Sequence, residues 1–600
     1  MIDVDDRKLS PVALRLMPVP GLPDAESRVP TRWEAALFAG KAWCFRIRRW
    51  FHDDFGRRPV RLKREPLAAR APAMGLSQSL LFPSDTPAER LLQAGKVQNL
   101  RVAARYLDGL VIPAGGLFSF WAQVPRPRRR LGFVQGRELR EGCVIASVGG
   151  GLCQLSNALY DAALKAGCDI VERHAHSRRI EGSMAAQGRD ATIFWNYVDL
   201  RFRPPADCQL QVALDRDELK VTLRRLGSPA RTSAPVSRNG LPGAPGADLP
   251  AASCETCGMV TCFRHESTAG RETATSTAWL VDGWWPEFDG YLRENAAPAD
   301  WLFTPLDSRR LRIGPYRWSS GGFAEVRQAS WLVVSRSLRS RRLAAQGAQR
   351  QRALLQMDGA LARHYARRLP FTATHLVISQ ALLPFLWRDG VLGGRSFDVL
   401  MTRLPLEALQ TILDRAAQAW PMSPTLADFR AEPALLAAER DALAAARYWI
   451  TPHSKIARLA GAKARKLDWH LPTATNRTTG DSTVFFPAST LGRKGAYELR
   501  EVARDLNLTL ALGGGILEDN EFWNGVRAVP ANSDPLSTAR LVVLPAWIED
   551  QPRRLLRAVA AGIPVIASDA CGLEGVSGAT TVPTGDVPAL RNAIIGATQG

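Results

Sequence analysis

Cysteine, acidic residues and long apolar runs are all scarce in this chain of 600 residues. Nine cysteines are too few for a small scaffold held together by disulfides, which excludes that class of secreted protein. The sequence contains no apolar run of about 18 residues, so we expect no membrane-spanning helix. The first residues, MIDVDDRKLS, lack the apolar stretch of a signal peptide, and we therefore expect a cytoplasmic protein.

The shortage of acidic residues leaves a strongly basic chain. Asp and Glu number 58 against 78 Lys and Arg, which gives a net charge of +20 and a pI of about 10.1. Such a charge favours anionic partners, namely phosphorylated sugars, anionic lipid surfaces or nucleic acid. Because no nucleic-acid-binding module is recognisable, nucleic acid is the least favoured of the three. The length predicts roughly three to five domains.

Residues 1–77 form an amino-terminal extension that contains one predicted helix, residues 32–55. Its apolar residues recur at alternating spacings of four and three, which is typical of a helix with one apolar face. They are Trp33, Leu37, Gly40, Cys44, Ile47 and Phe51. Basic residues lie among them, so the helix either packs on its own domain or lies on the inner face of an anionic membrane. We favour packing, which is the more common role of such a helix.

The segment GGGLCQLSNALYDAAL, residues 149–164, places three glycines directly before a cysteine and a helical apolar pattern. A helix beginning near Cys153 would direct free N–H groups and the positive end of its dipole at the sulfur, which stabilises a thiolate. His174, His176 and Asp190 follow and complete the residue types of a nucleophile, a base and an orienting carboxylate. The alternative is that Cys153 is a small buried apolar residue and that the histidines are structural.

These motifs, in this order, resemble the VanW family, which is named from glycopeptide-resistance clusters. The blocks PAGGLFSFW (113–121), GREL–EGC (136–143), GRDAT and YVDLRF contribute to the resemblance, which covers roughly residues 78–205. It implies an α+β domain, which we place at residues 78–225. No established activity comes with the family, so the resemblance implies no reaction for this domain.

A linker and a candidate metal motif follow this domain. Residues 226–253 are rich in Gly, Pro, Ser and Ala, which is typical of a flexible linker. Residues 254–265 then carry the spacing C-x2-C-x4-C-x2-H, which favours a tetrahedral structural Zn²⁺ site. An iron–sulfur cluster is the second choice. The four candidate ligands are Cys254, Cys257, Cys262 and His265.

The remaining chain alternates short β-rich runs with helical runs, which predicts an α/β fold with parallel sheets. We divide it into two Rossmann-like halves, residues 270–475 and 476–600. In the first half we expect a strand at SWLVVSRSL (330–338) and helices at 340–369 and 430–447. In the second half the β-rich runs are TVFFPAS, LTLALGGG, ARLVVLPAW and PVIASDACG. Ligands of such sheets bind at the carboxyl ends of the strands.

The last region resembles the nucleotide-sugar-binding half of retaining glycosyltransferases with the GT-B fold. The matching segments are GRKGAYEL, with Lys494 and Gly495, the glycines that begin with Gly513 and Gly514, and WIEDQPRRLLRAVAAGIPVIASDACGLEG (547–575). The resemblance implies that Lys494, with Arg493 beside it, contacts the donor diphosphate and that Glu549 contacts the donor sugar.

Two positions depart from that family. The glutamate expected eight residues after Glu549, which would bind the ribose, is Arg557, and a guanidinium accepts no hydrogen bond. The family's separate diphosphate arginine would fall near Ser489 and Thr490. These departures put the activity in doubt more than the fold.

Three functions remain open at this point. The first is a retaining glycosyltransferase that transfers a sugar from a nucleotide-sugar to a cell-envelope or polysaccharide precursor. The second is a scaffold whose degenerate transferase half only binds a nucleotide or glycan. The third is an enzyme of the VanW-like domain that uses Cys153 as nucleophile and His174 or His176 as base. We favour the first.

Overall fold

The computed structural model describes residues 59–68, 71–83, 87–140, 143–176, 179–180, 187–227, 248–249, 276–306, 316–343, 347–473 and 483–599, and also residues 40, 43–49 and 51. The chain divides into two compact units. The first comprises residues 1–275 with 370–374 and 393–395, and the second comprises residues 276–369, 375–392 and 396–600. None of the helices in the described residues is long and apolar enough to cross a membrane.

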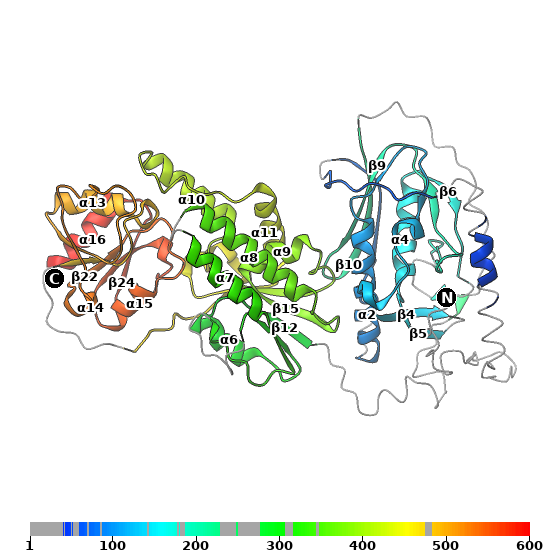
Figure 1. Ribbon diagram of the computed structural model, residues 1–600, viewed down its shortest axis with the longest axis horizontal. Helices are drawn as coiled ribbons and strands as arrows, with labels where there is room; N and C mark the ends of the chain where they lie inside the picture. The colour runs from blue at the N-terminus through cyan, green and yellow to red at the C-terminus, as the bar shows by residue number, and fades with distance from the viewer. Residues whose placement is uncertain are drawn as a thin grey trace. The chain divides into compact units, whose positions relative to one another are not determined.

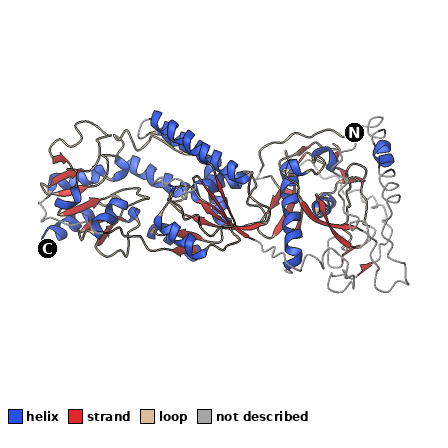
Figure 2. Ribbon diagram, turned by 60° about the horizontal axis from the view of Figure 1, so that its bottom comes forward, coloured by secondary structure: helices blue, strands red, loops and turns tan. Residues whose placement is uncertain are grey.

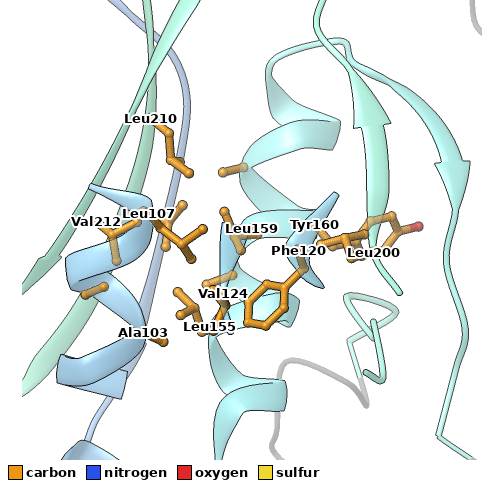
Figure 3. Close-up of a cluster of buried hydrophobic side chains, with 14 of the residues drawn as sticks. Ala103, Leu107, Phe120, Val124, Leu155, Leu159, Tyr160, Leu200, Leu210 and Val212 are labelled. Carbon is orange, nitrogen blue, oxygen red and sulfur yellow. The ribbon is translucent and has the colours of Figure 1, made fainter. Parts of the chain in front are cut away.

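The first unit is built on a four-stranded antiparallel sheet in the order β1-β10-β9-β2. Its strands are β1 (Ala73–Leu80), β2 (Val111–Ile112), β9 (Cys208–Leu214) and β10 (Glu218–Arg225). Helices α2 (Pro87–Leu107) and α4 (Leu152–Lys165) pack against it and against each other, as Figure 1 shows. Figure 3 shows the buried cluster between them, which includes Leu107, Leu159 and Val212.

Smaller elements complete the first unit. Strands β4 (Gln135–Arg140) and β5 (Cys143–Val148) form an antiparallel hairpin that leads into α4. A three-stranded antiparallel sheet has the order β3-β8-β6. The remaining elements are β3 (Phe118–Ser119), α3 (Phe120–Gln123), β6 (Asp169–Glu172), β7 (Arg179–Ile180), β8 (Arg201–Arg203) and β11 (Asp248–Leu249). The domain is therefore α+β, as predicted.

The described part of the predicted helix 32–55 is helical over residues 43–49. Arg49 forms a bidentate ion pair with Glu172, in which Nη2 lies 2.6 Å from Oε2. The ring of Phe45 stacks on that of Tyr197 with 6.1 Å between the ring centroids. These contacts lie within the first unit and favour packing on its own domain. Trp43 and Phe51 remain exposed. Membrane contact stays a prediction.

The second unit contains two parallel sheets (Figure 2). The first has the order β14-β13-β12-β15-β16-β17-β18. Its strands are β12 (Ser276–Leu280), β13 (Trp301–Thr304), β14 (Glu325–Gln328), β15 (Ala373–Ser379), β16 (Ser396–Leu400), β17 (Trp449–Thr451) and β18 (Ala464–Lys466). Its helices are α6 (Pro286–Asn295), α7 (Ser330–Arg342), α8 (Ala348–Ala366), α9 (Leu383–Arg388), α10 (Leu406–Ala419), α11 (Pro433–Ala445) and α12 (Ser454–Ala460).

The second parallel sheet has the order β21-β20-β19-β22-β23-β24. Its strands are β19 (Val484–Phe486), β20 (Thr509–Leu512), β21 (Arg527–Pro530), β22 (Leu541–Leu544), β23 (Val565–Ser568) and β24 (Ala579–Val582). Its helices are α13 (Ala496–Asp505), α14 (Pro535–Thr538), α15 (Arg553–Ala560) and α16 (Val587–Gln599). In Figure 1, α13 and α16 lie on one face of the sheet and α14 and α15 on the other. The predicted α/β architecture of two Rossmann-like halves is confirmed.

One strand prediction is wrong. The segment SWLVVSRSL, residues 330–338, lies in helix α7 and not in a strand. Its apolar residues Trp331, Val334 and Leu338 recur at helical spacing and are all exposed. A short apolar run does not by itself separate a buried strand from a helix, and here the spacing was the better guide.

Candidate functional sites

A cavity of about 400 Å³ lies at the carboxyl ends of β19, β20 and β22. The loops after these strands supply its walls, among them Ser489, Gly513 and Glu549, and the first turn of α15 supplies Arg553 and Arg554. Parallel strands all end at the same edge of their sheet, so residues distant in sequence meet there. The predicted Arg493, Lys494, Gly513, Gly514 and Glu549 all line this cavity.

Glycines let the loops of the cavity approach one another. A Cβ at Gly514 would lie 2.6 Å from Oγ of Ser489, and one at Gly513 would lie 2.9 Å from the ring of Phe485. Gly495 has φ +76° and would place a Cβ 2.1 Å from the carbonyl oxygen of Pro545. The loop before Gly495 therefore packs directly on the loop after β22, where the carbonyl oxygen of Arg493 accepts from the N–H of Trp547 at 3.0 Å.

That packing brings Lys494 to Glu549. The Lys494 Nζ donates to Oε2 of Glu549 at 3.0 Å and to the carbonyl oxygen of Ile548 at 3.0 Å. The two side chains are 19% and 15% exposed, so the pair is partly shielded from water. A cation and a carboxylate that were each expected to contact a donor thus contact each other in the cavity.

Two further residues of the site were missed by sequence reasoning. Glu518 accepts from Oγ of Ser423 at 2.8 Å, the hydroxyl of Tyr497 at 3.0 Å and the N–H of Gly492 at 2.5 Å, and so holds the start of the Arg493–Lys494 turn. Arg554 donates to the carbonyl oxygens of Pro487 at 2.7 Å and Gly513 at 2.9 Å. Glu518 lies outside the segments that carry the resemblance, and Arg554 lies within residues 547–575, where the resemblance implied no role for it.

Burial shifts the pKa of two ionisable residues beside the Lys494–Glu549 pair, Asp550 and Arg493. Burial raises the pKa of Asp550 to about 6, although Lys494 opposes the shift, and Glu549 adds to it. Burial also lowers the pKa of Arg493, against the attraction of Asp550 and Glu549. Both groups are therefore held where their charged forms are disfavoured.

Arg557 lies on the exposed face of α15, beyond the turn that lines the cavity. At this position a guanidinium stands in place of the expected carboxylate, and it accepts no hydrogen bond from ribose hydroxyls. Arg553, one turn earlier, is engaged by both carboxylate oxygens of the buried Glu287, at 2.6 Å each, and lies over the ring of Trp285. Arg553 therefore joins the two halves of the second unit.

The first unit holds a second candidate site. Cys153 is the second residue of α4 and is half-buried. His176 hydrogen-bonds the Cys153 thiol, and its Nδ1 lies 2.5 Å from Oδ1 of Asp190. The predicted Cys153, His176 and Asp190 therefore come together.

His174 faces a different group. Its Nε2 lies 3.3 Å from Oε1 of Glu172, and its side chain is 50% exposed. Glu172 in turn contacts Arg49 and Arg201. His174 thus lies at the exposed edge of a largely buried ion cluster. The sequence left its role and that of His176 open.

The predicted metal ligands Cys254, Cys257, Cys262 and His265 lie outside the described residues, and zinc and iron–sulfur both stay predictions. Within the described residues, no group of three or more His, Cys, Asp or Glu side chains is arranged to hold a metal ion.

Comparison with known proteins places one family in each unit. Residues 95–225 match the family model described as VanW like protein, and residues 498–599 match the one described as glycosyl transferases group 1. The amino-terminal half therefore contains a VanW-like domain and the carboxyl-terminal half a glycosyltransferase group 1 domain, as predicted.

Two curated relatives match the first unit. The vancomycin B-type resistance protein VanW of Enterococcus faecalis is 33% identical over 144 residues, which are 24% of this chain and 52% of that protein. The uncharacterized protein YoaR of Bacillus subtilis is 34% identical over 105 residues, 18% of this chain and 34% of that protein. The chain thus spans about half or less of the length of these relatives.

Solved structures of glycosyltransferases are similar to the second unit. The lipopolysaccharide outer core galactosyltransferase WaaB is 12% identical with a TM-score of 0.31, over 54% of this chain and 90% of that chain. Alr3699/HepE of Anabaena, solved with UDP, is 13% identical with a TM-score of 0.30, over 54% and 90%. Similarity this weak assigns no substrate.

Proposed function

We propose that this protein is a glycosyltransferase that transfers a sugar from a nucleotide-sugar to a cell-envelope or polysaccharide precursor. The observation that carries the proposal is the Lys494–Glu549 pair, which lies in a cavity at the carboxyl ends of parallel strands. Glu549 belongs to residues 498–599, which match the glycosyltransferase group 1 model, and Lys494 stands four residues before them. The matched VanW-like domain, one of whose relatives is named for vancomycin resistance, supports an envelope precursor as acceptor.

The geometry supports a specific role for the pair. When the bond between the donor sugar and the diphosphate breaks, negative charge grows on the departing phosphate oxygen, and a positioned cation stabilises it. Donor binding would move the Lys494 Nζ from Glu549 to the phosphates. The carboxylate of Glu549 would then be released to accept hydrogen bonds from sugar hydroxyls. A retaining outcome is proposed from the resemblance alone.

The test is donor binding by the full chain. We expect one of the UDP- or GDP-sugars to raise the melting temperature, because a ligand that binds only the folded state stabilises it. Lys494→Ala should weaken that binding at least about tenfold, which corresponds to roughly 1.4 kcal/mol. Lys455→Ala is the matched control, since Lys455 also forms a partly buried ion pair, with Asp569 at 2.9 Å, but does not line the cavity.

Two outcomes would contradict the proposal. If Lys494→Ala and Lys455→Ala lose the same affinity for the nucleotide-sugar, Lys494 has no specific role in donor binding. Binding without sugar transfer to any acceptor or to water would favour the second candidate function, a glycan- or nucleotide-binding scaffold. The replacement of the ribose-binding glutamate by the exposed Arg557 is the observation that favours this alternative.

We also propose that Cys254, Cys257, Cys262 and His265 hold a structural Zn²⁺, on the basis of ligand type and spacing. The purified chain should carry one equivalent of zinc by elemental analysis and lose it in Cys257→Ser. Iron in place of zinc would favour the iron–sulfur alternative. An unchanged metal content in Cys257→Ser would show that these residues do not hold the metal.

A cytoplasmic location is a further proposal that rests on the sequence, and peripheral contact of residues 32–55 with the inner face of the membrane is the alternative to packing on their own domain. Cell fractionation tests it. Recovery of the protein from the extracellular fraction would overturn it, and recovery only from the soluble fraction would remove the membrane contact.

A further inference from the structure

Three segments of the first unit bring a thiol, an imidazole and a carboxylate together. Cys153 comes from the start of α4, His176 from the segment that follows β6, and Asp190 from the segment before β8. Asp190 is 1% exposed and binds His176 twice, through Nδ1 at 2.5 Å and through the backbone N–H at 2.7 Å. The imidazole is thus oriented by the carboxylate, and the same side chain interacts with the Cys153 thiol.

The turn before Cys153 is built so that α4 begins at one defined place. A Cβ at Gly150 would lie 2.4 Å from the carbonyl oxygen of Gly136, and one at Gly151 would lie 2.1 Å from the Lys96 side chain. Asn99 on α2 donates to the carbonyl oxygen of Gly150 at 2.9 Å. The helix has 14 residues, and the backbone N–H groups of its first turn, including that of Cys153, have no partner within the helix.

Two further residues of α4 hold the carboxylate segment against the same helix. Asn157 Oδ1 accepts from the N–H of Ala191 at 2.7 Å, and the Ser156 hydroxyl donates to the carbonyl oxygen of Ala191 at 2.5 Å. Ala191 is the residue after Asp190. The motif CQLSN therefore supplies both the thiol and the supports of the orienting carboxylate.

The electrostatics agree with this geometry. Burial opposes a charge on His176, but hydrogen bonds to Asp190 and Cys153 outweigh it and raise the pKa of His176 to about 10. The imidazole is therefore protonated near neutral pH and places a cation beside the sulfur. Burial raises the pKa of the Cys168, Cys208 and Cys571 thiols to about 12, so these three thiols are protonated near neutral pH.

We propose that Cys153 is the nucleophile of an acyl-transfer site, with His176 as its acid and base and Asp190 as a positioning residue. The substrate class is a compound R–CO–X, an ester, thioester or amide. The sulfur bonds the carbonyl carbon, the C–X bond breaks, and X departs with the proton of His176. An acceptor H–Y then gives its proton to His176 and its Y to the carbon, which releases R–CO–Y and the thiolate. The Cys153 N–H faces the growing negative charge on the carbonyl oxygen.

The first test compares two cysteines of one molecule. Cys44 is exposed and Cys153 is half-buried, so access alone predicts that Cys44 reacts faster. After a short pulse of iodoacetamide on the full chain at pH 7, peptide mapping should show Cys153 modified at least about tenfold faster. Asp190→Asn should change the pH dependence of that rate, which a purely structural role would not do. Equal or slower modification of Cys153 would overturn the activated thiol.

The second test addresses acyl transfer itself. With p-nitrophenyl acetate the full chain should release a burst of p-nitrophenolate equal to the protein concentration and retain an acetyl group on Cys153. Cys153→Ala should abolish the burst, His176→Gln should slow it at least about 100-fold, and Cys44→Ala should leave it unchanged. Melting curves of each variant verify folding. Fast alkylation of Cys153 without acetyl transfer would overturn the acyl-transfer assignment.

Discussion

Asp550 shows how a single buried carboxyl next to Lys494 and Glu549 couples the cavity to pH. Its pKa in the folded protein is about 6, above the ordinary value of 3.8, chiefly because of burial. The folded state therefore binds this proton more tightly than the unfolded chain does. The resulting stabilisation is complete below about pH 4 and is lost as the pH rises through 6.

We therefore expect Asp550→Asn to stabilise the second unit at pH 7.5, by up to about 3 kcal/mol, because the substitution removes a disfavoured charge. The gain should vanish at pH 4, where the native carboxyl is already neutral. Urea unfolding at both pH values measures the difference. Asp505→Asn, at an exposed position on α13, is the control and should change stability by less than about 0.5 kcal/mol. A gain in stability that is the same at both pH values would show that the charge of Asp550 is not its cause.

At the scale of one element, α4 combines a chemical and a structural task. Its first turn carries Cys153, and its next turn holds the segment of Asp190 through Ser156 and Asn157. The helix is also part of the hydrophobic core, with Leu155 and Leu159 among the buried residues of Figure 3. Because the same helix carries Cys153, holds the segment of Asp190 and packs in the core, the thiol and the carboxylate are held in fixed positions relative to each other.

Asn157→Ala should therefore have two effects. Leaving the buried N–H of Ala191 without its acceptor should cost the first unit about 1–3 kcal/mol. Loosening Asp190 should also slow alkylation of Cys153 severalfold under native conditions. Asn157→Asp keeps an acceptor oxygen and should retain most of the stability. Urea unfolding and peptide mapping give the two readouts, and an unchanged alkylation rate would show that the Ala191 contact does not position Asp190.

At the scale of the whole molecule, the two units have separate hydrophobic cores. One cluster gathers residues of α2, α4, β9 and β10, and others gather residues of the two parallel sheets. Each unit thus buries enough apolar surface around its own centre to unfold as a unit.

Differential scanning calorimetry of the full chain should therefore resolve at least two transitions. Asn157→Ala should lower only one of them, and a bound nucleotide-sugar should raise only the other, because each change acts on one unit. A single transition that both changes move would contradict independent unfolding.

Local patterns carried much of the fold. Alternating β-rich and helical runs are sufficient for parallel sheets, because such strands need helical crossovers. The same patterns failed at residues 330–338, where the segment SWLVVSRSL, with four consecutive apolar residues, lies in helix α7. Contacts between distant segments could not be predicted from local sequence patterns. No spacing indicates that Glu518 holds the turn of Arg493, or that Arg554 donates to the loop at Pro487.

By itself the sequence determined the two parallel sheets, the glycine turn before Cys153 and the set of candidate residues in both sites, because glycines, periodicity and residue type are local properties. Only the tertiary structure decided which candidates meet. It placed His176 at the thiol and His174 on the surface, although the two stand two residues apart, because the segment after β6 presents them to different neighbours. It also paired Lys494 with Glu549, which are 55 residues apart in the sequence, since their loops pack where parallel strands end.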